Sequence, residues 1–222
     1  MKNLQVTIKL CSPAILAKNP LDGLLANLFF ARQKEAGTFN GDYQQELKFI
    51  ERDPDGFYHV SSPIFKVKSI NNTTIMKSFD SKEYRDLFPK AKPPKAITNL
   101  SSGAFKSHIV KLEQLNVDEV VFFVRGDIDV IVELLGNLRF LGKKSSLGFG
   151  EVEKIIIKKI KDDRSVVSNG VLMRQVPINS KWLDKVSNKE DLGAKIDALS
   201  HPYWDKKRET YVVVNIGEEN GL

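Results

Sequence analysis

Alternating polar and apolar residues predict the first strand of this chain. The pattern covers residues 3–10, NLQVTIKL, as expected of a strand with one buried face. Residues 118–126 and 150–160 are rich in β-branched and aromatic residues and are predicted as two more strands. A further strand is expected within residues 56–67, where Pro63 favours a sheet edge or a bulge.

Two segments between these strands carry apolar residues at helical spacing. The first is bounded by Asn19 and Pro20, which suit an N-cap and a first helical position, and by Gly37, which suits a C-terminus. Its apolar stripe consists of Leu21, Leu24, Leu25, Leu28 and Phe29. The second helix is expected to follow Asp127 as its N-cap, and its apolar positions are Ile128, Ile131, Val132 and Leu135.

The order strand–helix–strand–strand–helix–strand predicts an α+β fold with a ferredoxin-like (RRM-like) βαββαβ core. Such a core has a four-stranded antiparallel sheet with both helices on one face. We expect it to comprise residues 1–67 and 106–161, interrupted by a basic, extended insertion at 68–105. A C-terminal extension, residues 162–222, is expected to pack on this core.

The C-terminal extension contains two predicted elements and one predicted anchor. Residues 187–199, SNKEDLGAKIDAL, are expected to form a capped helix. Residues 210–216, TYVVVNI, are expected to form a strand that adds to the edge of the sheet. Trp204 is expected to anchor the extension on the core.

Composition narrows the class of protein. A hydrophobic content of 41% and a charged content of 28% are typical of soluble domains. No apolar run approaches the roughly 18 residues of a membrane span, and Lys9 interrupts the N-terminal apolar stretch, unlike a signal peptide. We therefore expect a cytoplasmic protein. The single cysteine, Cys11, excludes an intrachain disulfide and a cysteine-based zinc site, and is expected to be buried.

The positive charge is confined to two segments. Residues 61–111 hold ten Lys or Arg against three acidic residues, and residues 139–161 hold seven against two. The whole chain has a formal charge of +6, so the remainder is acidic. A basic surface limited to two segments is typical of a face that binds a polyanion, and it favours a nucleic-acid partner over lysines that only aid solubility.

Residues 139–152, RFLGKKSSLGFGEV, join the second helix to the last strand and are the first candidate site. Backbone N–H groups can surround a phosphate where glycine leaves the approach open, while lysine and serine add charge and donors. An aromatic ring between two glycines can stack on a base. The candidate RNA-binding residues here are Arg139, Lys143, Lys144, Ser145, Ser146, Gly148, Phe149 and Gly150. The alternative is an ordinary glycine-rich connection.

The insertion and its flanks form the second candidate site. Cations interleaved with aromatic residues suit the backbone and the unpaired bases of a single strand. The basic residues are Lys66, Lys68, Lys77, Lys82, Arg85, Lys90, Lys92 and Lys95, and the aromatic residues are Phe65, Phe79, Tyr84 and Phe88.

Lys106 and His108 lie two residues apart and would share one face of a strand. Such a pair permits metal-free RNA cleavage by general acid–base chemistry. A structural or RNA-stacking role for His108 is the favoured alternative. His59 and His201 have no carboxylate or histidine nearby in the sequence at metal-ligand spacing, so we expect no metal and no cofactor.

Four stretches in this order resemble a known family. They are SPAILAKNPLDGLLANLFFARQKEAG, SGAFKSHIVK, GDIDVIVELLGNLRFLGKKSSLGFGEV and HPYWDKKRETYVVV. Together they resemble the CRISPR-associated RAMP superfamily and, within it, the Cas-five-like (Csf family) subunit of type IV CRISPR effector complexes. The loop "LGKKSSLGFGEV" is similar to the glycine-rich loop between the last helix and last strand of that superfamily.

The resemblance implies a non-catalytic subunit that grips the 5′ handle of the guide (CRISPR) RNA and caps a filament of backbone subunits. The residues listed for the loop would hold RNA backbone, and the insertion would act as a thumb. The implied partners are the guide RNA, the Cas-seven-like backbone subunit and the Cas-eight-like large subunit. Target DNA is a further candidate, and a membrane is not.

Two other functions remain open from the sequence. One is a metal-independent endoribonuclease that cuts CRISPR repeats, with His108 as acid or base and Lys106 as oxyanion stabiliser. A single convincing ferredoxin-like core favours the non-catalytic role, because processing members of the superfamily often have two. The other is a basic scaffold protein that binds no RNA, which would make the charge pattern a coincidence.

Overall fold

The computed structural model describes residues 1–77 and 108–216, and only the backbone of Lys77 and His108. The chain forms two compact units. The first comprises Met1–Ser69 and Leu115–Leu222, and the second comprises Ile70–Gln114. Helices and antiparallel sheets occur together in the first unit, so the predicted α+β class is confirmed.

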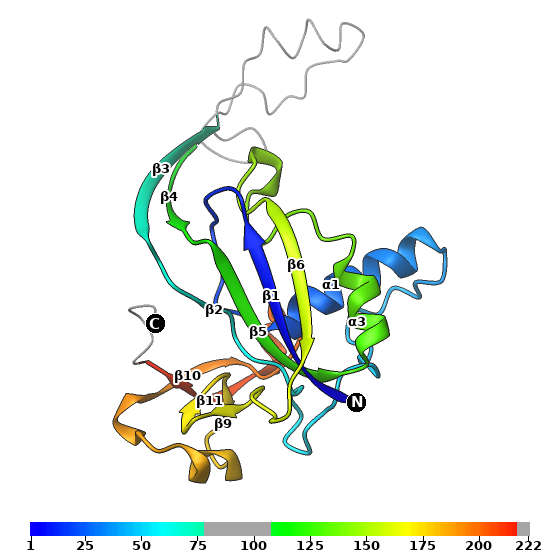
Figure 1. Ribbon diagram of the computed structural model, residues 1–222, viewed down its shortest axis with the longest axis vertical. Coiled ribbons are helices and arrows are strands. Elements are labelled where there is room, and N and C mark those ends of the chain that lie inside the picture. Colours follow the sequence, from blue (N-terminus) through cyan, green and yellow to red (C-terminus); the bar gives the residue numbers. More distant parts are fainter. Residues whose placement is uncertain (78–107, 217–222) are drawn as a thin grey trace, which may run out of the picture. The chain divides into compact units, whose positions relative to one another are not determined.

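The main sheet has four strands in the order β2–β5–β1–β6, and each pairs antiparallel with its neighbour (Figure 1). The strands are β1 (Lys2–Leu10), β2 (Ile64–Phe65), β5 (Glu119–Gly126) and β6 (Val152–Lys159). All four predicted strands are therefore present. β2 is an edge strand of only two residues directly after Pro63, which cannot donate to a ladder.

Two helices contribute residues to the same hydrophobic core as β1 and β5. They are α1 (Leu21–Glu35) and α3 (Ile128–Leu135), which contact each other. The register sets Leu4 opposite Val124, Val6 opposite Phe122 and Ile8 opposite Val120, and all six side chains belong to the buried core. Within the described ranges, neither helix is long and apolar enough to cross a membrane.

The predicted helix ends are confirmed at Asp127 and at Gly37, which follows the C-cap of α1 with φ +68°. Asp127 caps α3, and its carboxylate accepts a hydrogen bond from the N–H of Asp129 at 3.0 Å. The predicted cap at Asn19 is wrong, because the N-cap of α1 is Pro20, which makes no side-chain cap. The apolar stripe of α1 is also shifted: Ala26 and Phe30 are buried, whereas Leu24, Leu28 and Phe29 are only partly buried.

A two-stranded sheet is formed by β3 (Ser69–Lys77) and β4 (His108–Asn116). All of it belongs to the second unit except Ser69, Leu115 and Asn116. Residues 69–77 were expected to be part of an extended loop, so the start of the insertion differs from the prediction. The segment SINNTTIMK is rich in isoleucine and threonine, which favour strands, and pairing with β4 supplies the backbone hydrogen bonds.

The C-terminal extension has its own sheets. β9 (Val176–Pro177), β10 (Leu192–Ala198) and β11 (Glu209–Asn215) form a sheet in the order β10–β11–β9, and β7 (Val167–Ser168) pairs with β8 (Val171–Leu172). Short 3₁₀ turns occupy Lys181–Lys185, Lys189–Asp191 and Lys206–Arg208. A second hydrophobic cluster combines Phe57 of the core with five residues of the extension, Val166, Leu172, Val176, Val186 and Val213.

Three expectations for the extension and for Cys11 need correction. The predicted strand at 210–216 exists as β11, but it pairs with β9 and β10 rather than with the main sheet. The predicted helix at 187–199 is a 3₁₀ turn followed by β10, because β10 pairs with β11 along seven residue pairs. Trp204 is 72% exposed, so it is no buried anchor, and Cys11 is exposed as well.

Two buried polar residues attach the extension to the core instead. The Arg174 guanidinium donates to the carbonyl oxygens of Tyr58 in the core and of Leu199 in the extension. The carboxylate of Asp22 in α1 accepts hydrogen bonds from the His201 N–H at 3.1 Å and the Tyr203 hydroxyl at 2.7 Å. Arg174 and Asp22 are each at most 2% exposed.

Candidate nucleic-acid interface

The glycine-rich loop between α3 and β6 is fixed at its base by backbone hydrogen bonds. The Leu141 N–H donates to the Gly150 carbonyl at 2.7 Å, and the Gly150 N–H donates to the Pro13 carbonyl at 2.8 Å. The Lys143 N–H donates to the Ile15 carbonyl at 2.9 Å. The loop is therefore held against the segment that follows β1.

Two of its glycines are required by close backbone packing. Gly142 has φ +104°, and a Cβ atom there would lie 2.6 Å from the Ile15 carbonyl oxygen. Gly150 has φ +72°, and a Cβ atom there would lie 1.9 Å from the Leu141 carbonyl oxygen. Gly150 was predicted to hold RNA backbone, but it is buried and its N–H is already bonded. In this conformation it cannot donate to a phosphate.

The tip of the loop is exposed from Lys143 to Gly148. Lys144 has a left-handed conformation with φ 62°, and the tip continues as one 3₁₀ turn, Ser145–Leu147. The Gly148 N–H donates within this turn to Ser145, at 2.9 Å. Among the described residues, the N–H groups of Lys144, Ser145 and Ser146 have no hydrogen-bond partner. These free donors, two hydroxyls and two ammonium groups are suited to bind an anion.

The aromatic residue of the loop is less accessible than the sequence suggests. Phe149 is half-buried, whereas the neighbouring Leu147 is 55% exposed. Stacking of Phe149 on a base remains a prediction.

The main sheet adds a basic surface that was not predicted from the sequence. The β1–β6 register sets Lys9 opposite Lys154 and Gln5 opposite Lys158. All three lysines are exposed, and β6 begins two residues after the loop ends at Gly150. Like charges directly opposite each other are destabilising unless an anion is present, although Glu119 on the other side of Lys9 offsets part of this. The strand register, which the sequence does not show, brings these lysines together.

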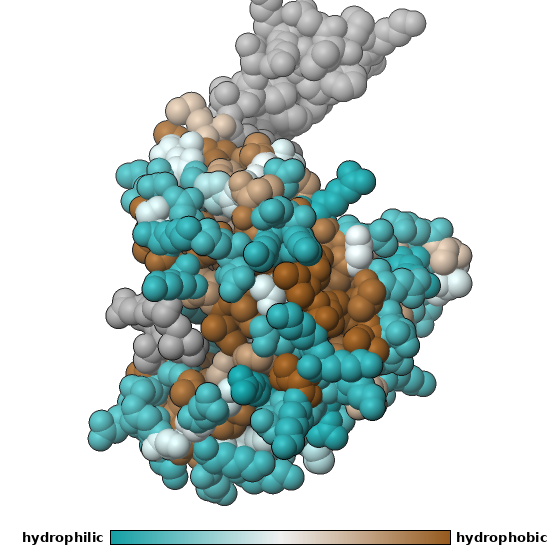
Figure 2. All heavy atoms as spheres, viewed as in Figure 1, coloured by the Kyte–Doolittle hydropathy of each residue, from teal (hydrophilic) through white to brown (hydrophobic). Residues whose placement is uncertain are grey.

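A structural role for the β6 lysines is also evident. β6 is an edge strand of the main sheet, and Ile155, Ile156 and Ile157 are half-buried within it. In the view of Figure 2, hydrophobic residues gather beside the strands and hydrophilic residues surround them. Lysines on an edge strand oppose pairing with other chains, so these side chains serve solubility even without RNA.

The remaining predicted residues are only partly described. Arg139 and Lys66 are exposed, and Lys68 is exposed but forms an ion pair with Asp118 at 2.7 Å. Lys77 and His108 lie in β3 and β4 without described side chains. Lys82, Arg85, Lys90, Lys92, Lys95 and Lys106 lie outside the described residues. The catalytic hypothesis for Lys106 and His108 therefore stays a prediction.

A buried polar cluster centred on His59 is a second site to consider. His59 Nδ1 lies 3.0 Å from an Asp163 carboxylate oxygen, and Nε2 lies 3.3 Å from Asp53. Ser165 Oγ lies 3.4 Å from Nδ1 but donates to Asp163 at 2.6 Å. Burial raises the pKa of Asp163, but hydrogen bonds from His59 and Ser165 outweigh it and lower the pKa to about 2.

This cluster lacks the arrangement of a hydrolytic triad. In a triad the serine hydroxyl donates to histidine, whereas the Ser165 hydroxyl donates to a carboxylate. Ser165 is fully buried, so no substrate reaches it. Trp182 Nε1 donates to Asp53 at 2.9 Å, which ties the extension to the same cluster. Among the described residues, no group of three His, Cys, Asp or Glu side chains is suited to hold a metal ion. The cluster is a structural junction.

Known proteins resemble this chain in sequence and in fold. The sequence profile of the family described as CRISPR type IV associated protein Csf3 matches residues 54–215. Among solved structures, a chain of the "Cryo-EM structure of the Type III-B Cmr-beta bound to cognate target RNA" matches with a TM-score of 0.39 and 13% sequence identity. That match covers 71% of this chain and 61% of the other. No curated protein matches this chain.

Proposed function

Because this chain belongs to the family of CRISPR type IV associated protein Csf3, we propose that it is a non-catalytic, RNA-binding subunit of a type IV CRISPR ribonucleoprotein. In this role it grips the 5′ handle of the guide RNA and caps the filament of backbone subunits. A Cas-seven-like backbone subunit and a Cas-eight-like large subunit are its proposed neighbours. Target DNA is a further proposed ligand.

The exposed tip of the glycine-rich loop is the observation that carries this proposal. Lys143 and Lys144 provide two cations, and the N–H groups of Lys144, Ser145 and Ser146 have no protein partner among the described residues. A phosphate backbone is a ligand that uses both kinds of group. Lys9, Lys154 and Lys158 extend the positive charge onto β1 and β6.

The topology of the first unit supports assignment to the ferredoxin-like fold. In chain order its core elements are β1, α1, β2, β5, α3 and β6, as expected, with β3 and β4 inserted between β2 and β5. The sheet order β2–β5–β1–β6, with antiparallel neighbours, is the order this fold requires. The loop then lies between the last helix and the last strand of the core.

The salt dependence of RNA binding tests the proposal. Fluorescence anisotropy would follow the chain binding to a labelled single-stranded RNA that carries the repeat-derived 5′ handle, at several salt concentrations. Each phosphate contact contributes about 0.7 to the slope of log affinity against log salt for a single strand. Lys143→Ala/Lys144→Ala should therefore reduce the slope by about 1.4.

A control with the same change in net charge separates the loss of specific phosphate contacts from the loss of positive charge. Lys181→Ala/Lys189→Ala removes two exposed lysines of the C-terminal extension and should leave the slope unchanged. An equal slope for the loop variant and the wild type would exclude the two loop lysines from the interface. Absence of RNA binding by the wild type would exclude the function as proposed.

The same samples test the endoribonuclease alternative. The wild type would be incubated with repeat RNA in the presence of a chelator, and the products separated on a denaturing gel. We expect intact RNA. Cleavage that His108→Ala abolishes while binding is retained would instead establish a repeat-processing enzyme.

A further inference from the structure

The side chain of Ser12 connects the segment that follows β1 to both sides of the glycine-rich loop, which lies beside it in Figure 1. Its hydroxyl donates to the Gly148 carbonyl at 2.8 Å and accepts from the Glu151 N–H at 2.8 Å. A hydroxyl has one donor and two acceptor sites, so one side chain can make both hydrogen bonds at once. Both partners are backbone atoms, so the two bonds set the path of the loop.

The Ser12 hydroxyl reaches a part of the loop that backbone bonds do not. Backbone groups of Cys11, Pro13 and Ile15 bond to the base of the loop. Within the described part of the chain, the bond from Ser12 is the only hydrogen bond between residues 144–148 and a residue outside the loop. The tip is therefore held against the rest of the chain by this hydroxyl.

The bond from Ser12 continues into the 3₁₀ turn of the tip. Gly148 accepts from Ser12 through its carbonyl and donates through its N–H to the Ser145 carbonyl at 2.9 Å. Lys144, just before this turn, has φ 62°, a left-handed conformation that is unfavourable for a residue with a side chain. The tip therefore needs a contact that outweighs this cost, and Ser12 supplies one.

The surroundings of these bonds suit a role in binding more than a role in folding. The 3₁₀ turn contains no buried residue, and Gly148 and Glu151 are both exposed. Without the Ser12 hydroxyl, water can replace it at both backbone groups, so the chain stays folded. The conformation of the tip, in contrast, loses its hydrogen bond to the rest of the chain.

We propose that Ser12 is a positioning residue for RNA binding. Its hydroxyl holds the tip in the one conformation in which the free N–H groups of Lys144, Ser145 and Ser146 are available together to a phosphate. Ser12 itself does not touch the RNA. Without the hydroxyl the tip populates other conformations, and binding then includes the cost of ordering it. The choice of RNA as the ligand rests on the proposed function, whereas the ordering of the free tip does not.

Three serine substitutions in the full-length chain test the proposal by RNA binding. Ser12→Ala removes the hydroxyl, and Ser12→Thr keeps one. Ser168→Ala is the matched control, because Ser168 is also half-buried but lies in β7 of the C-terminal extension. Each variant would be titrated with the labelled 5′-handle RNA at several salt concentrations, and circular dichroism would verify that it is folded.

Two net hydrogen bonds change a conformational equilibrium by roughly 30-fold, which turns a mostly ordered tip into a mostly disordered one. We therefore expect Ser12→Ala to bind RNA about threefold to tenfold more weakly than the wild type. The slope of log affinity against log salt should not change, because both loop lysines remain and still contact phosphate in the complex. Ser12→Thr and Ser168→Ala should bind like the wild type.

Nuclear magnetic resonance measures the positioning itself in the RNA-free chain. The backbone amide order parameters of residues 145–148 should be near about 0.85 in the wild type and fall below about 0.6 in Ser12→Ala. This measurement does not depend on RNA. If the wild type bound no RNA, the proposed function would fail, while a fall in these order parameters would still show that Ser12 orders the tip.

Four results would overturn the proposal. Wild-type RNA affinity in a folded Ser12→Ala variant would show that the hydroxyl serves the structure alone. Equal losses in Ser12→Ala and Ser12→Thr would show that the hydroxyl is not the group responsible. Weaker binding with unchanged order parameters, or with a reduced salt slope, would indicate a direct contact with RNA instead of positioning. An equal loss in Ser168→Ala would show that the effect is not specific to the loop.

Discussion

Removing the carboxylate of Asp163 should destabilise the chain by about 2 kcal/mol at neutral pH. In the native structure this carboxylate accepts hydrogen bonds from the Ser165 hydroxyl at 2.6 Å and the Ser165 N–H at 2.9 Å, and lies 3.0 Å from His59 Nδ1. These contacts lower its pKa from the ordinary 3.8 to about 2, and the side chain is only 22% exposed. A difference of nearly two pKa units corresponds to about 2 kcal/mol.

The sign of the pH dependence follows from the lowered pKa. The folded state holds the ionised carboxylate more strongly than the unfolded state does. The stabilisation is therefore fully present above about pH 4 and is lost as the pH falls toward about 2. Asp163→Asn should differ from the wild type by about 2 kcal/mol at pH 7 and by almost nothing near pH 2.

Urea unfolding at a series of pH values, followed by circular dichroism, measures this difference directly. Asp162→Asn is the control, because Asp162 is the exposed neighbour of Asp163 in the chain. It removes the same charge and should leave the free energy of unfolding nearly unchanged. A difference between Asp163→Asn and the wild type that stays constant down to pH 2 would refute the argument, since it would not arise from ionisation.

Three further substitutions test the loop and the capping of α3. Gly150→Ala should cost roughly 2–5 kcal/mol and Gly148→Ala only about 1–2 kcal/mol. Both have positive φ, but only Gly150 has a backbone oxygen within 2 Å of the added Cβ atom, and urea unfolding that shows equal losses would contradict this. Asp127→Ala should cost about 1 kcal/mol, because the Asp129 N–H loses its acceptor. Thermal unfolding measures this loss, and an unchanged midpoint would show that the cap contributes nothing.

The parts of the fold that follow from local patterns were predictable from the sequence. β1 alternates polar and apolar residues, and Asp127 lies directly before an apolar helical repeat. The helix predicted at 187–199 failed because distant strand pairing decides the structure there. Residues 192–198 contain good helix formers but pair with β11, and Gly193 leaves room for Ile216, whose Cγ2 would lie 2.7 Å from an added Cβ atom. A local pattern contains no information on that partner strand.

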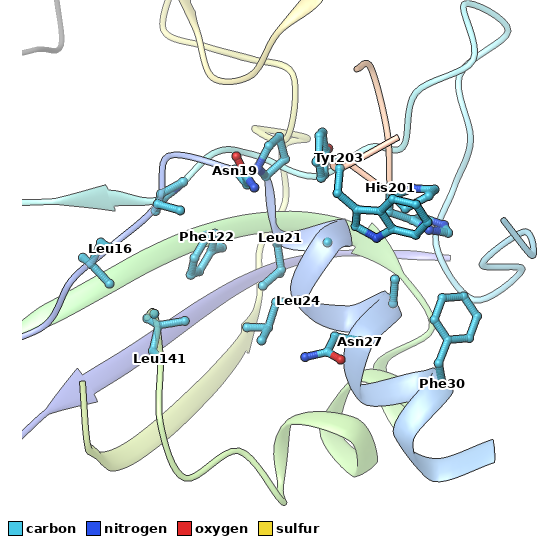
Figure 3. A pocket seen from close by; sticks show the side chains of 18 of the residues that line it. Leu16, Asn19, Leu21, Leu24, Asn27, Phe30, Phe122, Leu141, His201 and Tyr203 are labelled. Carbon is cyan, nitrogen blue, oxygen red and sulfur yellow. The ribbon is translucent and has the colours of Figure 1, made fainter. Parts of the chain in front are cut away.

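The candidate sites were predictable only where their residues are neighbours in the sequence. The lysines of the loop are adjacent in sequence and were found from it, whereas Lys9 and Lys154 meet only through the strand register. An apolar pocket is likewise lined by α1, Leu141 and the turn at 201–204 (Figure 3), which are far apart in the chain. Asp22 gave no sequence indication of its role, since an acidic residue in the first turn of a helix is ordinary.

The glycine-rich loop shows why residue type alone overstates the number of ligand contacts. Gly142 and Gly150 are needed because neighbouring backbone atoms leave no room for a side chain, whereas nothing lies within 4 Å of the Cβ position of Gly148. The two packed glycines fix the base of the loop, and the fixed base presents the charged tip in one conformation. Stability and RNA affinity should therefore be separable: substitutions at the base lower the first, and substitutions at Lys143 and Lys144 lower the second. If substitutions at the base and at the tip each lowered both the stability and the RNA affinity, the loop would fold only when its ligand is bound.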